Sequence, residues 1–182
     1  MSDDYIPDIL DVVDEDDRVV GFADYDEIHA RGLRHRSVNV LAFKDETLTE
    51  LLLVQRSLTQ KVSKGLFSVS VGGHLEKGEF YIDAARREFR EELLANSQEL
   101  PAGLDFIEIA RYQNNSRPTN QENTVLYSVV CSGPFAFDAK EVERADWAKL
   151  DEVLIDVGAY PEKYTGTFIG ALKRFVQRLA RE

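Results

Sequence analysis

The sequence predicts a fold of the α/β class, in its mixed α+β form, with a β-sheet between helices. Segments of β-prone residues alternate with segments of helical periodicity, but without the regular strand–helix–strand spacing of a parallel sheet. The longer helical segments each have one apolar face, which a helix buries against a sheet. The 182 residues, 43% of them hydrophobic, are enough for one domain with its own core.

The first predicted elements are a β-hairpin and a short helix. Residues 9–13 and 18–22 are β-prone and are separated by an acidic turn at residues 14–17. The turn does not match a Ca²⁺-binding loop, because the glycine and the distal glutamate that such a loop requires are missing. The short helix is predicted at residues 24–31.

The rest of the chain predicts a sheet and two longer helices. Strands are expected at residues 37–44, 50–56, 66–71, 104–112 and 123–132, and a short segment is expected around Trp147. Helices are expected at residues 81–95 and 165–181, and the second has an apolar stripe formed by Phe168, Leu172, Phe175 and Leu179. Residues 114–121 are polar and long for a hairpin connection, which leaves two interpretations open: a loop that closes over substrate, or a flexible surface loop.

Composition and charge exclude several classes of protein. The formal net charge of −11 argues against general binding to nucleic acid, although bound divalent cations can reverse the local field where an acidic enzyme acts on phosphates. No segment reaches the roughly 20 apolar residues of a membrane span, and the acidic start is unlike a signal peptide. Cys131 follows an apolar run and is interpreted as a core thiol. We therefore expect a cytoplasmic protein without nucleic-acid or membrane partners.

The most informative segment is a glycine-containing loop at residues 72–79, followed by a helix that carries several glutamates. At about 100° per residue, Glu88, Glu91 and Glu92 fan out beside the apolar face of this helix. Carboxylates this close repel one another, so the arrangement is typical of a site that holds cations. Mg²⁺ is the cation expected, because it takes a few carboxylates and completes its shell with water and phosphate oxygens.

The loop supports this interpretation. Gly72, Gly73 and Gly78 let the backbone turn sharply or approach a metal closely, and Arg87 can pair with a loop carboxylate such as Glu79. A solvated helix with ordinary Glu–Arg pairs is the alternative, and it would be favoured for the helix sequence alone. The glycine loop at this distance reverses that preference.

These residues resemble the Nudix box, written Gx5Ex7REUxEExGU, where U is an aliphatic or aromatic residue. Eight positions match over 23 residues: Gly73, Glu79, Arg87, Glu88, Phe89, Glu91, Glu92 and Ala95. The remaining chain resembles the family branch that is similar to isopentenyl-diphosphate isomerase, on the basis of the N-terminal hairpin, residues 32–36 and 53–56, and Trp147 before residues 150–153. The resemblance implies a Nudix fold at residues 8–182, and we expect residues 1–7 to be a disordered N-terminus.

The resemblance also implies roles for individual residues. Glu88 and Glu92 are expected metal ligands, Glu91 is a ligand or the base that activates water, and Gly73 belongs to the metal-binding set. Glu79 and Arg87 are expected as a scaffold pair. The position of the late box glycine holds Leu94, so the helix is expected to run half a turn further, towards Asn96. The resemblance leaves open which glutamate is the base.

Weaker features concern the isomerase branch. In the isomerases a cysteine occupies the position of Gly72 and carries the proton transfer, so its absence argues against isomerase activity. The isomerases also bind a second metal, and this chain has matching residues at His35, His74 and Glu122. His29 is one residue out of register and Thr124 replaces a second glutamate. A transition-metal site and ordinary polar residues near a pocket both remain open interpretations.

Two cations and one carboxylate are candidate substrate-binding residues. Arg56 and Lys64 precede the glycine loop, where a cation can hold an outer phosphate. Glu122 is the third candidate substrate-binding residue. A surface ion pair is the alternative for Arg56, and Trp147 is assigned to the core.

We therefore interpret the chain as a Mg²⁺-dependent hydrolase, with Mn²⁺ as another usable ion. It is expected to cleave a phosphoanhydride bond in a nucleoside diphosphate derivative or a related diphosphate. The alternatives are a non-catalytic module that binds a nucleotide or metabolite, and isomerisation of isopentenyl diphosphate. The sequence leaves the substrate and the oligomeric state open, including a homodimer.

Overall fold

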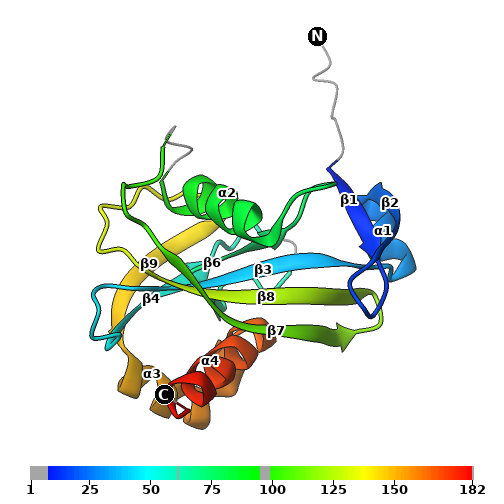
Figure 1. The fold of residues 1–182 in the computed structure, drawn as a ribbon. Coiled ribbons are helices and arrows are strands. Elements are labelled where there is room, and N and C mark those ends of the chain that lie inside the picture. Colours follow the sequence, from blue (N-terminus) through cyan, green and yellow to red (C-terminus); the bar gives the residue numbers. More distant parts are fainter. Residues whose placement is uncertain (1–7, 61, 95–98, 182) are drawn as a thin grey trace.

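A computed structural model describes residues 8–60, 62–94 and 99–181 and has the expected α+β fold (Figure 1). Its strands are β1 (Ile9–Val13), β2 (Val19–Asp24), β3 (Arg34–Phe43), β4 (Glu50–Arg56), β5 (Phe67–Ser68), β6 (Val71–His74), β7 (Phe106–Arg117), β8 (Asn120–Val130) and β9 (Val142–Lys149). Its helices are α1 (Tyr25–Arg31), α2 (Tyr81–Leu93), α3 (Leu150–Ala159), the 3-10 turn η1 (Pro161–Lys163) and α4 (Gly166–Leu179). The expected disorder of residues 1–7 lies outside the described residues.

The main sheet is mixed. Its strand order is β5-β4-β3-β8-β7, with β6 also paired to β3 and β9 also paired to β4. The β3–β8 pair is parallel, and the other pairs are antiparallel. The strands β1 and β2 form a separate antiparallel hairpin, as expected.

Helices cover both faces of the main sheet (Figure 1). On one face α2 contributes buried Ala84, Ala85, Phe89 and Leu93 to a core that includes Val38 and Val125. On the other face α4 contributes Phe168, Ala171, Leu172 and Phe175, packed against residues such as Phe43. The prediction of a sheet between helices is therefore confirmed, and the spacing of the apolar residues in each helix is the reason.

One expected strand is divided in the structure. The segment predicted at residues 66–71 forms β5, which pairs with β4, and β6, which pairs with β3. The buried Ser70 hydroxyl lies between these two partners, where it accepts the Ala42 N–H at 2.9 Å and donates to the Leu52 carbonyl at 2.8 Å. The side chain of Ser70 thus replaces backbone pairing at the point where β3 and β4 separate.

The connection expected at residues 114–121 is mostly strand. β7 runs to Arg117 and β8 begins at Asn120, so the loop interpretation is wrong for most of this segment. Polar residues fit here because one side of the hairpin faces solvent, and the pairing continues with a register shift between Asn114 and Arg117.

Two helices differ from the prediction. α2 ends at Leu93, and Leu94 forms an isolated bridge with Ala136, so the helix does not continue through Leu94. Asn96 lies outside the described residues. α3 was not predicted as a helix; it follows β9, in which Trp147 packs against the core as expected.

Cys131 is buried in the core, as expected. Among the described residues, no helix has both the length and the apolar character needed to cross a membrane.

Candidate active site

A cavity of about 610 Å³ opens beside β6, at the place where α1, the end of α2 and the start of α4 come together. Its polar lining comes from segments that are distant in the sequence: Tyr25, His29, Asn39, Arg56, His74, Glu92, Asn120, Glu122, Glu141 and Thr165. Gly72 and Gly73 also line it. The glycine loop and the glutamate helix therefore meet at one cavity.

Gly73 is in close contact with Glu88. A Cβ atom added at Gly73 would lie 2.0 Å from Glu88 Oε1 and 2.1 Å from its Cδ. Only glycine allows the Glu88 carboxylate to rest against the backbone of β6. The contact with Glu88 on α2 thus explains why a glycine stands at position 73 of the box.

Glu92 reaches the cavity one turn further along α2. The Gly72 N–H donates to Glu92 Oε1 at 3.2 Å, and the partly buried Glu92 side chain lines the cavity. Burial, followed by the charge of Glu88, raises the pKa of Glu92 well above its ordinary value. Burial also raises the pKa of Glu88, while Arg87 acts against this shift. Without a cation, the two neighbouring carboxyl groups resist being ionised at the same time. A bound cation would favour the ionised form of both.

Arg87 joins the loop to the helix. Its Nε and Nη2 atoms donate to the two oxygens of Glu79 at 3.0 and 2.9 Å, in a bidentate pair. Arg87 Nη2 also donates to the His74 carbonyl at 2.9 Å, and Nη1 donates to Glu88 Oε1 at 2.8 Å. Burial alone would lower the pKa of Arg87, but the hydrogen bond to Glu79 and the nearby carboxylates raise it. The guanidinium is therefore held charged at the centre of this network.

Glu91 differs from the other two glutamates of α2. Its carboxylate accepts from Arg87 Nη1 at 3.2 Å, its side chain is 38% exposed, and it is not part of the described cavity lining. The three glutamates share one helix, but only Glu92 faces the cavity directly, with Glu88 behind Gly73.

The two candidate cations lie in different places. Arg56 lines the cavity, and its Nη2 donates to Gln60 Oε1 at 2.9 Å. Lys64 is exposed and is not part of the described lining, although Ser63, its neighbour in the same turn, lines the cavity. The structure thus brings Arg56, but not Lys64, to the site.

Glu141 also lines the cavity and was missed in the sequence. It lies just before β9, where its carboxylate accepts from Gln60 at 2.6 Å, and its charge contributes to the raised pKa of Glu92. An isolated glutamate between strands carries no signal in the sequence, so only the fold reveals it.

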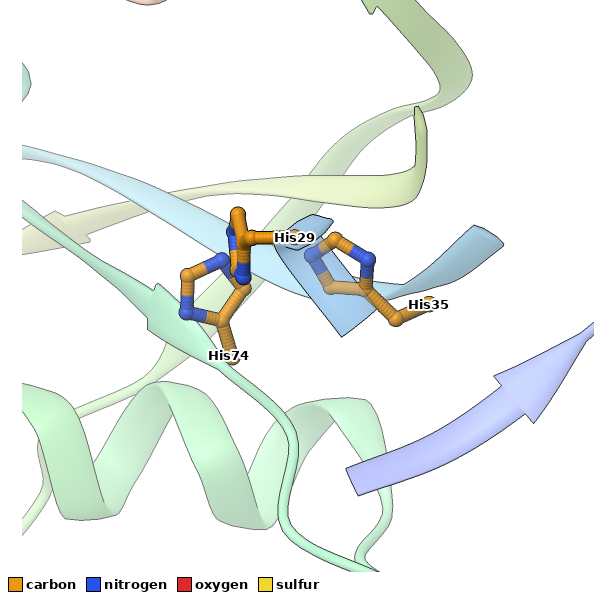
Figure 2. A group of neighbouring side chains, drawn as sticks. All are labelled: His29, His35 and His74. Carbon is orange, nitrogen blue, oxygen red and sulfur yellow. The ribbon is translucent and has the colours of Figure 1, made fainter. Parts of the chain in front are cut away.

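Three histidines converge beside the cavity, which His29 and His74 line (Figure 2). One nitrogen each of His29, His35 and His74 lies within 4.8 Å of the others. Glu122 Oε1 lies 3.5 Å from His74 Nε2 and 3.9 Å from His35 Nε2. Glu122 thus joins the histidines rather than the candidate phosphate-binding cation. His29 belongs to the cluster although the sequence places it out of register.

The hydrogen bonds of the cluster fix the direction of two rings. His29 Nδ1 lies 2.8 Å from the Tyr25 carbonyl, and His35 Nδ1 lies 3.0 Å from the Leu33 carbonyl. Both Nε2 atoms then carry an unprotonated lone pair, and the buried His35 Nε2 has no hydrogen-bond partner among the described residues. Burial and the neighbouring His74 lower the pKa of His35 to about 4, so this ring is neutral at pH 7. A neutral ring with its other nitrogen bonded to a carbonyl is the usual state of a metal-binding histidine.

The family follows from comparison of the whole chain. A family model described as the NUDIX domain matches residues 33–166, well over half of the chain. The chain is a Nudix hydrolase. It is 26% identical over 172 residues to the uncharacterized Nudix hydrolase YfcD of Escherichia coli strain K12, covering 94% of this chain and 88% of the relative. It is 29% identical over 165 residues to isopentenyl-diphosphate Delta-isomerase 2 of Aromatoleum aromaticum, covering 91% of this chain and 85% of the relative.

Solved structures agree with this assignment. This Nudix hydrolase superimposes on DR0079 from Deinococcus radiodurans with a TM-score of 0.75 at 25% identity, covering 91% of this chain and 98% of DR0079. It also matches the NUDIX domain of Shewanella oneidensis NrtR complexed with ADP ribose, at a TM-score of 0.57 and 19% identity over 79% of this chain and 86% of that one. The resemblance to the Nudix family and to its isomerase-like branch is thereby confirmed.

Proposed function

We propose that this Nudix hydrolase uses Mg²⁺, held by Glu88 and Glu92, to cleave a phosphoanhydride bond in a nucleoside diphosphate derivative or a related diphosphate. The observation that supports this most is the placement of both carboxylates against Gly72 and Gly73 of β6, the two glycines that line the cavity. Mn²⁺ has similar ligand preferences and is expected to substitute.

The residues fit a hard divalent cation. The carboxylate oxygens of Glu88 and Glu92 are hard donors, and a bound cation would favour the ionised form of both carboxyl groups, whose pKa values are raised without it. Mg²⁺ typically takes one or two carboxylates and leaves its other positions to water and phosphate. Gly73 leaves room for the Glu88 carboxylate beside the backbone. When bound, Mg²⁺ would neutralise charge on the diphosphate and make a water molecule more acidic.

The side chains of the protein supply orientation and charge. Glu79 and Arg87 hold the loop and α2 in register, and Arg87 fixes the Glu88 carboxylate at 2.8 Å. Arg56 would bind an outer phosphate, because its guanidinium is the cation that reaches the cavity from the end of β4. Glu91 accepts a hydrogen bond from Arg87, so we assign it to the same network.

We also propose a second metal at the three histidines and Glu122. The unpartnered, buried His35 Nε2 supports this, since an unsatisfied polar atom without a ligand would be costly. Imidazole nitrogens with one carboxylate suit Zn²⁺, Mn²⁺ or Fe²⁺. Metal analysis of purified protein, with His29→Ala and His74→Ala as variants, tests it. Zn²⁺, Mn²⁺ or Fe²⁺ retained at the wild-type amount in both variants, with Glu88 and Glu92 unchanged and Mg²⁺ in excess, would contradict the assignment.

The substrate is expected among small diphosphates, and a cytoplasmic location agrees with the buried free thiol of Cys131. The complex of the Shewanella NUDIX domain with ADP ribose makes ADP-ribose the first compound to test. The deciding experiment is a panel of nucleoside di- and triphosphates, dinucleotide polyphosphates, sugar nucleotides and prenyl diphosphates, with Mg²⁺ or Mn²⁺. Cation-dependent cleavage of at least one diphosphate is expected. Binding of the same compounds without cleavage would favour the non-catalytic module.

Isomerisation of isopentenyl diphosphate is not proposed. Gly72 has no side chain to exchange a proton with carbon, and a Cβ at this position would lie 3.0 Å from Asn39 Oδ1.

A further inference from the structure

The N-terminal hairpin, residues 9–24, is hydrogen-bonded to the glycine loop at residues 72–79. The Lys77 N–H donates to the Ile9 carbonyl at 2.8 Å, and the Gly78 N–H donates to Asp11 Oδ2 at 2.9 Å. The Lys77 ammonium lies 3.6 Å from the centre of the Phe22 ring. Two consecutive loop residues are therefore attached to both strands of the hairpin.

The turn of the hairpin reaches the other side of the same loop. Asp17 Oδ1 accepts from the Tyr81 hydroxyl at 3.0 Å and from Arg36 Nε at 2.9 Å. Tyr81 is the first residue of α2, and Arg36 lies on β3. Burial, with the charge of Asp17 and the hydrogen bond to it, raises the pKa of Tyr81, so the hydroxyl keeps its proton and remains a donor.

Glu79 lies between these two anchors. Residues 77 and 78 are bound to β1, residue 81 is bound to the hairpin turn, and Glu79 accepts both hydrogen bonds from Arg87. Any displacement of the loop would move Glu79, and the Arg87 guanidinium would move with it. Since Arg87 also holds Glu88, the hairpin is connected to this candidate metal ligand through its hydrogen bonds to the loop, the loop backbone, and the hydrogen bonds of Glu79 to Arg87 and of Arg87 to Glu88.

Asp11 is the most informative member of this series. Its side chain is on β1 and buried, with 6% of the residue exposed, and it lies 3.8 Å from Arg36 Nη1. A buried carboxylate that accepts a loop N–H is a strong and directional anchor. The matched family segment begins at residue 33, so the hairpin and Asp11 lie outside it.

We propose that Asp11 is a positioning residue, which sets the Mg²⁺ affinity of the site by fixing the loop that carries Glu79. The inference rests on the proposed function only in that Mg²⁺ binds at Glu88 and Glu92. Its effect passes through the loop and Arg87, and Asp11 itself does not touch metal or substrate.

The test compares Asp11→Ala and Asp11→Asn with wild type in the full chain. Mg²⁺ affinity is measured by calorimetric titration, and amide hydrogen exchange of residues 76–80 is measured without metal. Asp11→Ala is expected to speed exchange in the loop and to weaken Mg²⁺ binding by about threefold to tenfold, at or below the range typical for groups that contact a ligand directly. Asp11→Asn keeps an oxygen that can accept the Gly78 N–H, and it is expected to restore most of both properties.

Asp156→Ala is the matched control, because Asp156 accepts the Tyr164 hydroxyl at 2.7 Å on α3, away from the loop. It is expected to leave Mg²⁺ affinity unchanged. A folded Asp11→Ala protein with wild-type loop exchange and wild-type Mg²⁺ affinity would overturn the proposal, as would equal weakening by Asp156→Ala. If wild type itself binds no Mg²⁺, or binds it independently of Glu92, then the proposed function fails instead, and the loop exchange still reports on Asp11.

Discussion

Replacement of Gly73 by alanine is expected to weaken Mg²⁺ binding while leaving the fold and its stability almost unchanged. The added Cβ would lie 2.0 Å from Glu88 Oε1, whereas ordinary contacts begin at 3.4 Å, so the carboxylate must move by about 1.4 Å (3.4 minus 2.0). Mg²⁺ holds its ligands at about 2.1 Å in a strict octahedron, so a ligand moved this far is lost. We expect Mg²⁺ affinity to fall on the order of tenfold to a hundredfold, and turnover at low Mg²⁺ to fall with it.

The same substitution should have little effect on stability. The atoms that the new methyl group meets belong to the end of a flexible side chain, which can swing away without moving the backbone. We expect the free energy of unfolding without metal to change by about 1 kcal/mol at most. Gly158→Ala on α3 is the control, because nothing lies within 4 Å of an added Cβ there, and it should keep wild-type Mg²⁺ binding.

Calorimetric titration with MgCl2 and chemical denaturation provide the two measurements. A folded Gly73→Ala protein that binds Mg²⁺ as wild type does would refute the reasoning, since Glu88 could not then be a ligand in the position that the structure gives it.

Three further predictions concern other parts of the cavity. The pKa of His35 is lowered to about 4 from 6.5, so without metal its contribution to stability is present above pH 6.5 and is lost as the pH falls through 4. Between pH 7 and pH 4, the free energy of unfolding should fall by up to about 3 kcal/mol more in wild type than in His35→Gln. An equal fall in both proteins would contradict this. Arg56→Ala should raise KM for the best substrate on the order of tenfold with the fold intact; an unchanged KM would remove Arg56 from phosphate binding. Isopentenyl diphosphate should not be converted to its dimethylallyl isomer, and NMR detection of conversion at an enzymatic rate would show that Gly72 does not exclude it.

The local features of the site were readable from the sequence. Glu88, Glu91 and Glu92 share a helix, and their directions follow from about 100° per residue. The pairing of Arg87 with Glu79 follows equally from the spacing of loop and helix. The sequence could not show which of the three glutamates reaches the cavity, because the orientation of the Glu91 side chain towards Arg87 depends on side-chain packing.

Residues that depend on tertiary structure were missed or misplaced. His29 is out of register in the sequence, but Gly32 in a left-handed conformation (φ 63°) ends α1 and turns the chain back, which brings the His29 and His35 rings to 5.1 Å. Glu141 reaches the cavity only because β9 pairs with β4. Both strands of the β7–β8 hairpin were predicted, but its end at residues 114–121 was misread as a loop, since the polar residues there obscure strand periodicity.

The most direct test of the account is the Mg²⁺ dependence of turnover in Glu92→Gln. The amide keeps the shape of the side chain and removes a charged ligand, so turnover of the best diphosphate should fall on the order of a hundredfold to ten-thousandfold. Because removal of one crowded charge relieves repulsion with Glu88, the melting temperature without metal should stay level or rise, while the stabilisation added by Mg²⁺ should shrink. Unchanged, Mg²⁺-dependent turnover in a folded Glu92→Gln protein would contradict the assignment of the metal site to α2.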